Sequence, residues 1–387
     1  MIHSPFKYGF TVSGNSFTNR ETEKEKLHNN LISGINTIII SPRRWGKSSL
    51  VEAVMSDIKK KDLNHKTVLV DLFYVSSEEE FLETFAEKII KASATKWEDR
   101  IKNAKEFFKH IIPTINLGID PTNDFSINFK WDEIKKHKDE ILNLPETIAK
   151  KKNISFIICM DEFQNLATFR NYPVLEKKIR SVWQRQKHVT YCLYGSKRHM
   201  MSDVFNNSSK PFYRFGDIIF LQKISSSHWI NFIVKNFKET GKEISSKNAA
   251  LISNVMGSHS WYVQQLSSYV WEMTKTTAGI KEIQSAISEL IYANSPFFQK
   301  EVEVLSNTQV NLLKAIINNE VQLTSVAVMS KYKIGTPQNV IKNIRILTNN
   351  DIIDKYDGKQ ELLDPAFRLW FLKQFYNKDF TNLTVSD

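Results

Sequence analysis

The feature that most constrains this chain is the junction TIIISPRRWGKSSL at residues 37–50, where an apolar run ends in a basic turn that leads into a helical pattern. A phosphate-binding loop needs backbone N–H groups that point into one concavity, a helix N-terminus behind them, a lysine and a hydroxyl. The turn at 41–46 ends in Gly46, and Lys47 and Ser48 follow it. The sequence of strand, turn and helix therefore predicts a phosphate-binding loop.

The pattern G-x-x-x-x-G-K-[ST] is broken only at Ser41, which stands where the first glycine is usual. That glycine eases the backbone geometry and contacts no phosphate through a side chain, so serine is compatible with the loop if its φ is negative. The alternative is a basic helix start that contains Gly-Lys-Ser by chance. The residues expected to contact the nucleotide here are Ser41, Pro42, Arg43, Arg44, Trp45, Gly46, Lys47, Ser48 and Ser49.

A second motif, which is acidic, lies about 110 residues later: Asp161 and Glu162 end the apolar run SFIICMDE (155–162). Magnesium bound with ATP needs an acidic residue at the carboxyl end of a neighbouring parallel strand. We expect Ser48 and Asp161 to hold Mg²⁺, Lys47 to bind the phosphates, and Glu162 to orient and deprotonate the attacking water. An Asp-Glu pair at a strand end is more often structural when it occurs alone, but here it accompanies the loop.

The next apolar run, VTYCLYGS (189–196), ends in Gly195 and Ser196. A small polar group at this strand end could sense the γ-phosphate, so Ser196 is a further catalytic candidate. A plain turn after a strand is the alternative.

The order of apolar runs predicts three domains. Short strand-like runs alternate with helical patterns through residues 1–222, which indicates an α/β core with a parallel sheet. An insertion at about 97–150 contains alternating residues around a Pro-Asn-Asp turn, which predicts a β-hairpin between two lysine-rich helices. Residues 223–300 show only helical periodicity, and 301–387 read as three helices and a hairpin, a winged-helix arrangement with 336–349 as its recognition-type helix.

Composition limits the choice of partner and compartment. The formal net charge is +11 over 387 residues, yet residues 301–387 hold ten Lys and Arg and ten Asp and Glu, so the excess lies in residues 1–300. A DNA-reading module usually concentrates basic residues on its own face, so this balance disfavours DNA without excluding it. No membrane-length apolar run and no signal sequence occur, so we expect a cytoplasmic protein with no membrane partner. Cys159 and Cys192 lie in strand-like runs and are expected to be core residues.

Several motifs together resemble the archaeal-type ATPase family, ATPase domain 2, of the STAND branch of AAA+ P-loop NTPases. The stretch FTNRETE (17–23) is similar to F-x-G-R-E-x-E, and SPRRWGKS and DEFQ are similar to the family's phosphate loop and acidic strand. GSKRHMM (195–201) carries the glycine, serine and methionines of a sensor motif. PFYRFGD (211–217) approximates P-[LF]-[YF]-x-R through Arg214, and GSHSWYV (257–263) is similar to G-G-H-P-Y-Y-L. Four positions depart from the family's motifs: Asn19, Ser41, Ser260 and Arg214, which is shifted along the sequence.

The resemblance covers about residues 15–370 and implies an AAA+ core, a helical lid and a C-terminal winged helix. It also implies that Phe17 and Arg20 lie near the base or ribose, that His259 contacts the nucleotide from the lid, and that Arg214 serves as a catalytic arginine. Its cofactors would be ATP and Mg²⁺.

These observations predict an ATP-hydrolysing molecular switch that controls a macromolecular partner, most simply a protein. Two alternatives stay open. One is a DNA-associated AAA+ loader or motor, similar to initiator ATPases, in which subunits assemble on nucleotide binding. The other is a nucleotide-locked scaffold for protein docking, which the presence of Lys47, Ser48, Asp161 and Glu162 argues against.

Overall fold

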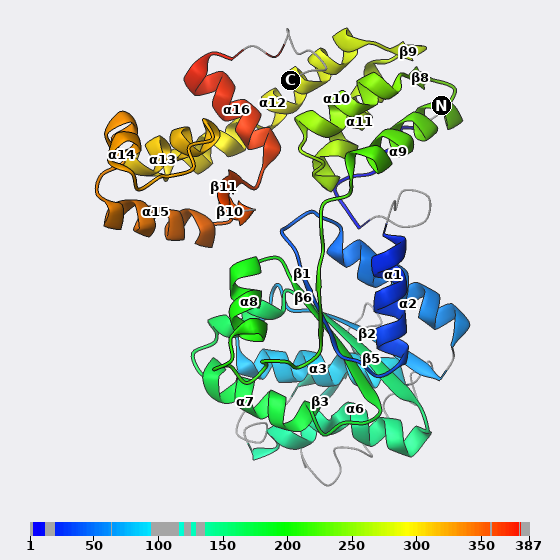
Figure 1. Ribbon diagram of the computed structural model, residues 1–387. Helices are drawn as coiled ribbons and strands as arrows, with labels where there is room; N and C mark the ends of the chain where they lie inside the picture. The colour runs from blue at the N-terminus through cyan, green and yellow to red at the C-terminus, as the bar shows by residue number, and fades with distance from the viewer. Residues whose placement is uncertain are drawn as a thin grey trace. The chain divides into compact units, whose positions relative to one another are not determined.

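The computed structural model describes residues 3–11, 20–62, 64–93, 116–119, 125–128, 136–356, 358–378 and 380. The chain divides into two compact units. One comprises Arg20–Arg43 and Lys47–Leu221, and the other comprises Met1–Asn19, Arg44–Gly46 and Gln222–Asp387. Each unit is described on its own (Figure 1).

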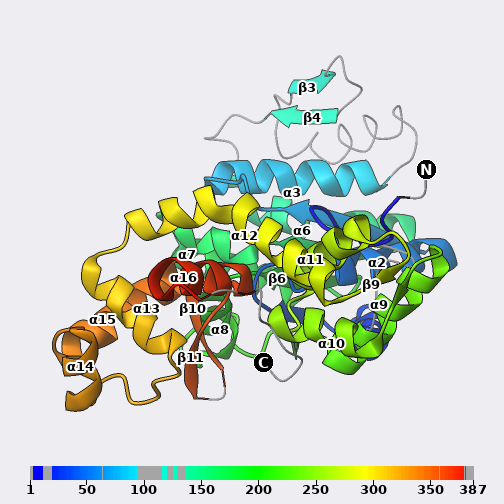
Figure 2. The same ribbon diagram turned by 90° about the horizontal axis from the view of Figure 1, so that it is seen from above.

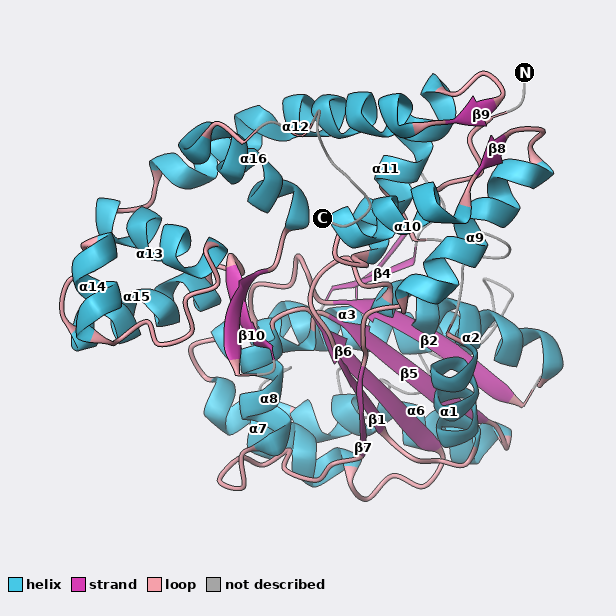
Figure 3. Ribbon diagram, turned by 45° about the horizontal axis from the view of Figure 1, so that its top comes forward, coloured by secondary structure: helices cyan, strands magenta, loops and turns pink. Residues whose placement is uncertain are grey.

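The first unit is built on a five-stranded sheet in which all neighbouring strands run parallel, with order β2-β5-β6-β1-β7 (Figure 3). Its strands are rich in β-branched and aromatic residues that suit a pleated, buried surface. The predicted parallel sheet is thus confirmed. The strands are β1 (Thr37–Ile40), β2 (His65–Asp71), β5 (Ser155–Asp161), β6 (Val189–Gly195) and β7 (Asp217–Phe220).

Helices cover both faces of this sheet because successive strand residues point to opposite sides. On one face, Ile38 and Ile40 share a buried cluster with residues of α3 (Glu78–Ser93), α6 (Lys138–Lys152) and α7 (Tyr172–Trp183). The intervening Ile39 is also fully buried and lies outside that cluster. The helices α1 (Glu21–Ile32) and α2 (Lys47–Lys61), which pack against each other, contribute their own buried leucines, valines and isoleucines.

The insertion contains the predicted hairpin. β3 (Asn116–Ile119) and β4 (Phe125–Asn128) pair antiparallel, and β4 lies beside α3 (Figure 2). Of the two lysine-rich helices expected around it, the second is α6. The first falls on residues outside those that the structure describes.

The second unit begins its lid with three helices: α9 (Ser226–Glu239), α10 (Ser246–Val255) and α11 (Ser260–Met273). The expectation that strands stop after residue 223 is wrong in detail, because β8 (Glu243–Ile244) pairs in parallel with β9 (Thr277–Ala278). Each lies in a connection between helices, where two residues of extended chain pair without interrupting the helical pattern. The predicted helical lid is otherwise confirmed.

The helix α12 (Ile280–Glu303) is longer than the sequence pattern indicated, since it continues through Pro296. Proline removes one N–H bond to the carbonyl four residues earlier, that of Tyr292. Because Tyr292 is exposed, water can satisfy that carbonyl, and the helix runs on past the expected boundary near residue 300.

The C-terminal part has the winged-helix arrangement predicted from the sequence. Three helices are followed by an antiparallel pair of strands. A further helix, which was not predicted from the sequence, closes the core through Phe367, Trp370 and Phe371. These elements are α13 (Asn307–Ile317), α14 (Val326–Tyr332), α15 (Pro337–Asn349), β10 (Ile353–Tyr356), β11 (Lys359–Leu362) and α16 (Pro365–Tyr376).

The first described residues pack on the lid rather than on the sheet. Phe6 is buried, with its ring 6.0 Å from that of Phe232 and 5.7 Å from that of Phe237. The N–H of Lys7 donates to Oε1 of Gln264 at 3.0 Å.

In the parts of the chain that the structure describes, no helix combines the length and apolar character needed to cross a bilayer. The remaining short elements of the first unit are the 3₁₀ helix η2 (Phe163–Thr168) and α8 (Arg198–Asn206).

Candidate functional site

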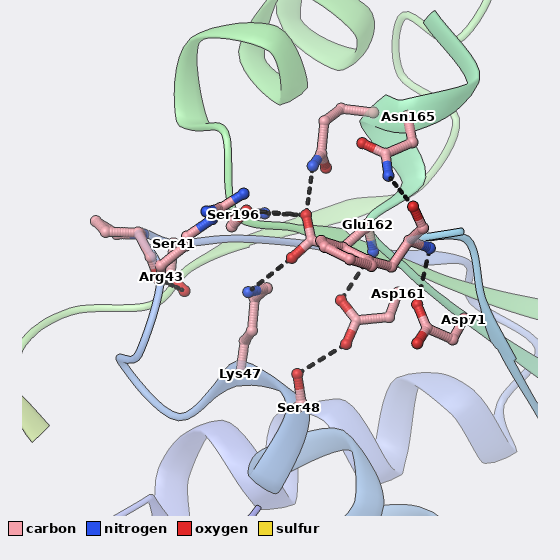
Figure 4. A network of polar contacts seen from close by, with 12 residues as sticks. Ser41, Arg43, Lys47, Ser48, Asp71, Asp161, Glu162, Asn165 and Ser196 are labelled. Atoms are coloured by element: carbon pink, nitrogen blue, oxygen red, sulfur yellow. Dashed lines mark hydrogen bonds and ion pairs between the residues drawn. The ribbon is translucent and has the colours of Figure 1, made fainter. Parts of the chain in front are cut away.

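The parallel sheet gathers the motif residues at one edge. The loop 41–46 follows β1, Asp161 ends β5, and Ser196 follows β6, the strand that lies between β5 and β1 in the sheet. Because the carboxyl ends of parallel strands meet at the same edge, three motifs separated by up to 155 residues in the sequence come together. Figure 4 shows the polar network that they form.

The backbone of the loop explains why serine is accepted at its first position. Ser41 is fully buried, is not among the described residues with positive φ, and its hydroxyl donates to the Pro42 carbonyl at 3.1 Å. The left-handed positions are instead Arg44, with φ of 65°, and Gly46, with φ of 93°. The condition for serine at this position, a negative φ, is therefore met, and Gly46 occupies a conformation that favours glycine.

Lys47 and Ser48 form the first turn of α2 and both point toward the end of β5 (Figure 4). Lys47 is buried, and its Nζ lies 3.6 Å from Oε1 of Glu162. The hydroxyl of Ser48 donates to Oδ2 of Asp161 at 2.8 Å. The loop and the acidic strand end are thus joined by one ion pair and one hydrogen bond.

Glu162 leaves β5 in the left-handed conformation, with φ of 52° and ψ of 40°. This conformation is uncommon for a residue with a Cβ and is maintained only where surrounding contacts fix it. Its own N–H donates to Oδ1 of Asp161 at 2.8 Å. The turn separates the two adjacent carboxylates, so that Asp161 contacts Ser48 while Glu162 contacts Lys47.

The carboxylate of Glu162 accepts several further hydrogen bonds on its Oε2 atom. The hydroxyl of Ser196 donates to it at 2.8 Å and the Ser196 N–H at 3.4 Å, and Nε2 of Gln164 also donates to it. Arg43 extends the network, since its Nε donates to the Ser196 hydroxyl at 3.3 Å. Ser196 therefore connects the loop to the carboxylate expected to act as the base.

The same environment shifts the pKa values of the Asp161 and Glu162 carboxyl groups in opposite directions. Burial alone would raise the pKa of Glu162, but the Lys47 ammonium and the donors of Gln164 and Ser196 hold that pKa below its usual value. Burial raises the pKa of Asp161 even though Lys47 and Ser48 favour its charged form. Glu162 is thus held as a carboxylate, and Asp161 would gain from a further cation nearby.

The chemistry of these groups fits magnesium. Mg²⁺ prefers oxygen ligands and usually takes one or two from the protein, with phosphate oxygens and water completing its shell. The Ser48 hydroxyl and the Asp161 carboxylate, 2.8 Å apart, form such an oxygen pair. Among the described residues there is no group of three or more His, Cys, Asp or Glu side chains that could hold a metal alone.

Other predicted site residues lie outside this network. Arg214 is exposed and left-handed (φ 54°), with its guanidinium carbon 5.2 Å from the Tyr213 ring centre. Arg20 is buried, and its Nη1 donates to Oε1 of Glu23 at 2.8 Å. Phe17 and Asn19 fall outside the described residues.

Three other motif residues named from the sequence are also buried. Trp45 is 5% exposed, and Ser49 is 6% exposed on the inner side of α2. His259, at the N-cap of α11 in the second unit, is 5% exposed, and its Nδ1 finds no hydrogen-bond partner among the residues that the structure describes. Burial and neighbouring cations, Lys223 among them, lower the pKa of His259 to about 3.

No individual role was predicted from the sequence for three residues that lie near this network. Gln164 contacts Glu162, Asn165 donates through Nδ2 to the Leu72 carbonyl at 3.1 Å, and Asp71 accepts the Phe73 N–H at 2.9 Å. Asn165 thereby ties the segment after β5 to the end of β2. The spacing of Gln164, two residues after Glu162 in DEFQ, is the signal that could have indicated it.

Comparison with known proteins agrees with this geometry. Residues 17–266 match a family described as an ATPase domain predominantly from Archaea, and residues 296–373 match a probable winged-helix domain. A search of curated proteins finds no match.

Solved structures with the same fold include the Walker-type ATPase PABY2304 of Pyrococcus abyssi. It is 16% identical, with a TM-score of 0.65, over 92% of this chain and 96% of that chain. The Aeropyrum pernix ORC2 protein, solved as ADPNP–ADP complexes, is 15% identical with a TM-score of 0.56, over 94% and 96% of the two chains. At these identities the likeness concerns the fold.

The parallel sheet, the helical lid and the winged helix are the parts of the fold that the motifs predicted. The family match extends over more than half of the chain and includes both the loop and the acidic strand end. The chain is an ATPase and belongs to the family of ATPase domains found predominantly in Archaea.

Proposed function

We propose that this ATPase is a Mg²⁺-dependent molecular switch of the STAND type, whose nucleotide state controls a macromolecular partner in the cytoplasm. The observation that carries the proposal is the continuous network from Lys47 and Ser48 to Asp161, Glu162 and Ser196. A scaffold that only binds nucleotide would need the loop, but it would not need a buried glutamate held as a carboxylate beside it.

Each residue of the network has a role in the proposed reaction. Lys47 and the N–H groups of the loop bind the phosphates, and Ser48 and Asp161 hold Mg²⁺. The metal, when bound, neutralises charge on the phosphate oxygens. Glu162 orients the attacking water and takes its proton, and Ser196 senses the γ-phosphate. Arg43 positions Ser196 through the contact at 3.3 Å.

The residues outside this network keep the roles that the family resemblance implies, as parts of the proposal. Phe17 and Arg20 would contact the base or ribose, and His259 would contact the nucleotide from the lid. Arg214, exposed on the first unit, would act as the catalytic arginine toward a second copy or a partner protein.

The catalytic assignment is tested with Glu162→Gln and Lys47→Ala. We expect E162Q to bind ATP normally and to hydrolyse it about 10²- to 10⁴-fold more slowly, the usual contribution of a general base. K47A should bind ATP at least roughly tenfold more weakly, because a charge-assisted contact to phosphate is lost. Lys59→Ala, at the exposed C-terminal end of the same helix, is the matched control and should behave as the unchanged protein. Unchanged turnover in E162Q would remove Glu162 from the mechanism.

The second candidate, a DNA-associated loader, has one specific observation in its favour. The exposed face of α15 carries Lys342 and Arg345, no acidic residue lies between 337 and 349, and Lys331 and Lys333 precede it. The neutral balance of residues 301–387 weighs against it.

Duplex DNA binding measured by fluorescence anisotropy between about 50 and 200 mM salt separates the two candidates. The switch predicts no binding even at the lower salt concentration. The loader predicts affinity that falls steeply with salt and is weakened by Lys342→Glu together with Arg345→Glu, both exposed positions whose replacement should leave the fold intact.

A further inference from the structure

Gln164 lies in η2, two residues after Glu162, and its side-chain amide contacts the Glu162 carboxylate. Only 1% of this residue is exposed. Its Nε2 donates to Oε2 of Glu162, the oxygen that Ser196 also contacts. Gln164 is therefore a direct neighbour of the carboxylate assigned as the base.

Packing fixes the position of this amide. A methyl group added at Gly195 would lie well inside contact distance of Oε1 of Gln164, and 3.0 Å from the sulfur of Met201. Phe163 and Leu166, also in η2, are buried and anchor the segment in the core. The absence of a Cβ at residue 195 thus makes room for the Gln164 side chain at the end of β6.

Stability does not account for an amide at this place. Oε1 of Gln164 is buried and has no hydrogen-bond partner among the described residues. Leaving a buried acceptor unpaired is unfavourable, because the group has lost its hydrogen bonds to water and gained none in the protein. An apolar side chain of similar size would fill the same volume and remove that penalty, so the amide is explained better by what its Nε2 atom does.

The other donors to Glu162 have a second task in the proposed function. Lys47 and Ser196 are both assigned contacts to phosphate, and bound phosphate competes with Glu162 for them. Gln164 belongs neither to the loop nor to a strand end, and it follows Glu162 by only two residues in the sequence. It is the side-chain donor that can stay with the carboxylate throughout the reaction.

We propose that Gln164 is a positioning residue that keeps the Glu162 carboxylate oriented toward the attacking water while Lys47 and Ser196 serve the phosphate. Gln164 acts through Glu162 and touches no substrate. The inference rests on the proposed function, because it needs Glu162 to be the base. It adds a residue whose loss should affect the chemical step and leave binding intact.

The test is Gln164→Met in the full chain, since methionine keeps the length and volume of glutamine but cannot donate. We expect kcat to fall about 10- to 100-fold, the range for a misplaced catalytic group. KM and the affinity for a slowly hydrolysed ATP analogue, measured by calorimetry, should stay within about twofold. The thermal midpoint should not fall, since the unpaired oxygen is removed. A purely packing role predicts normal kcat in Q164M.

A second pair of variants tests the close approach at Gly195. Gly195→Ala should displace the amide and lower kcat as Q164M does. Gln164→Ala vacates the space that the added methyl group needs, so the double variant should be no slower than Q164A alone, a coupling typical of residues in contact. Additive losses in the double variant would contradict the inference.

The outcomes separate this inference from the function on which it rests. Turnover in the unchanged protein that is lost in E162Q supports the function, and normal kcat in Q164M then overturns the role of Gln164 alone. Absence of turnover in the unchanged protein, or normal turnover in E162Q, overturns both. A fall in analogue affinity that matches the fall in kcat would assign Gln164 to binding and would also overturn the inference.

Discussion

At the scale of single residues, the geometry of the site depends on two left-handed positions, Gly46 and Glu162, and not on the missing first glycine of the loop. Ser41 stands at a position of ordinary φ, whereas Gly46 and Glu162 have φ of 93° and 52°. A non-glycine residue in the left-handed region costs about 1–3 kcal/mol when the surroundings hold it there. At Glu162 those surroundings are Asp161, Lys47 and Ser196, so the turn and the polar network depend on each other.

The first prediction concerns the glycine positions of the loop. Ser41→Gly should leave ATP affinity within about twofold and should lower stability by roughly 0.5–1 kcal/mol, because it only adds backbone freedom. Gly46→Ala should weaken ATP binding at least about tenfold, since an L side chain is strained at φ of 93°. Calorimetric titration with ATP measures both. A larger loss of affinity in S41G than in G46A would contradict this account of the loop.

The second prediction concerns magnesium. Asp161→Asn should raise the Mg²⁺ concentration needed for half-maximal hydrolysis by at least about tenfold, because a neutral amide holds a divalent cation poorly. Asp71→Asn is the matched control: Asp71 lies opposite Asp161 in the pairing of β2 with β5, is exposed, and contacts a backbone N–H. Its magnesium dependence should not change. Equal shifts in the two variants would place the metal elsewhere on this edge.

At the scale of elements, the apolar pattern predicted the sheet strands, which are continuous apolar runs buried on both faces, and the lid helices, each of which buries one regular face. It failed where no regular face exists. The first described residues form no helix or strand, and individual contacts of Phe6, Lys7 and Tyr8 hold them on the lid. The role of Gln164 was missed for a related reason: DEFQ places it two residues after Glu162, but their contact depends on the left-handed conformation of Glu162, which helix or strand periodicity does not predict.

The third prediction tests the packing of this N-terminal segment. Phe6→Ala should lower the free energy of unfolding by about 3–5 kcal/mol, because a buried aromatic ring is removed from between two others. Phe10→Ala, in the same segment but 64% exposed, should change it by less than about 0.5 kcal/mol. Urea unfolding of the full chain measures both. Similar effects of the two substitutions would mean that the segment does not pack on the lid in solution.

At the scale of the whole molecule, the second unit joins lid and winged helix through a buried acidic contact. The hydroxyl of Tyr262 on α11 donates to Oδ2 of Asp364, whose Oδ1 accepts the Phe367 N–H at 2.9 Å and caps α16. Glu301, near the end of α12, lies close to the same carboxylate. Burial, and then the charge of Asp364, raise the pKa of Glu301 to about 7. The lid and the winged helix are thus connected at a buried site where a negative charge on Glu301 is unfavourable.

The last prediction follows from the sign of that shift. Between the ordinary pKa of a glutamate, near 4.5, and about 7, the folded chain binds a proton at Glu301 that the unfolded chain has released. Stability is therefore lost as pH rises through this interval. The loss should be roughly 1–2 kcal/mol after allowance for solvent screening at a partly exposed group. The amide introduced by Glu301→Gln is uncharged at every pH. The urea midpoint of this variant should therefore exceed that of the unchanged protein at pH 8 and should match it near pH 4.5. A midpoint in E301Q that falls between pH 4.5 and 8 as steeply as in the unchanged protein would show that another group causes the dependence.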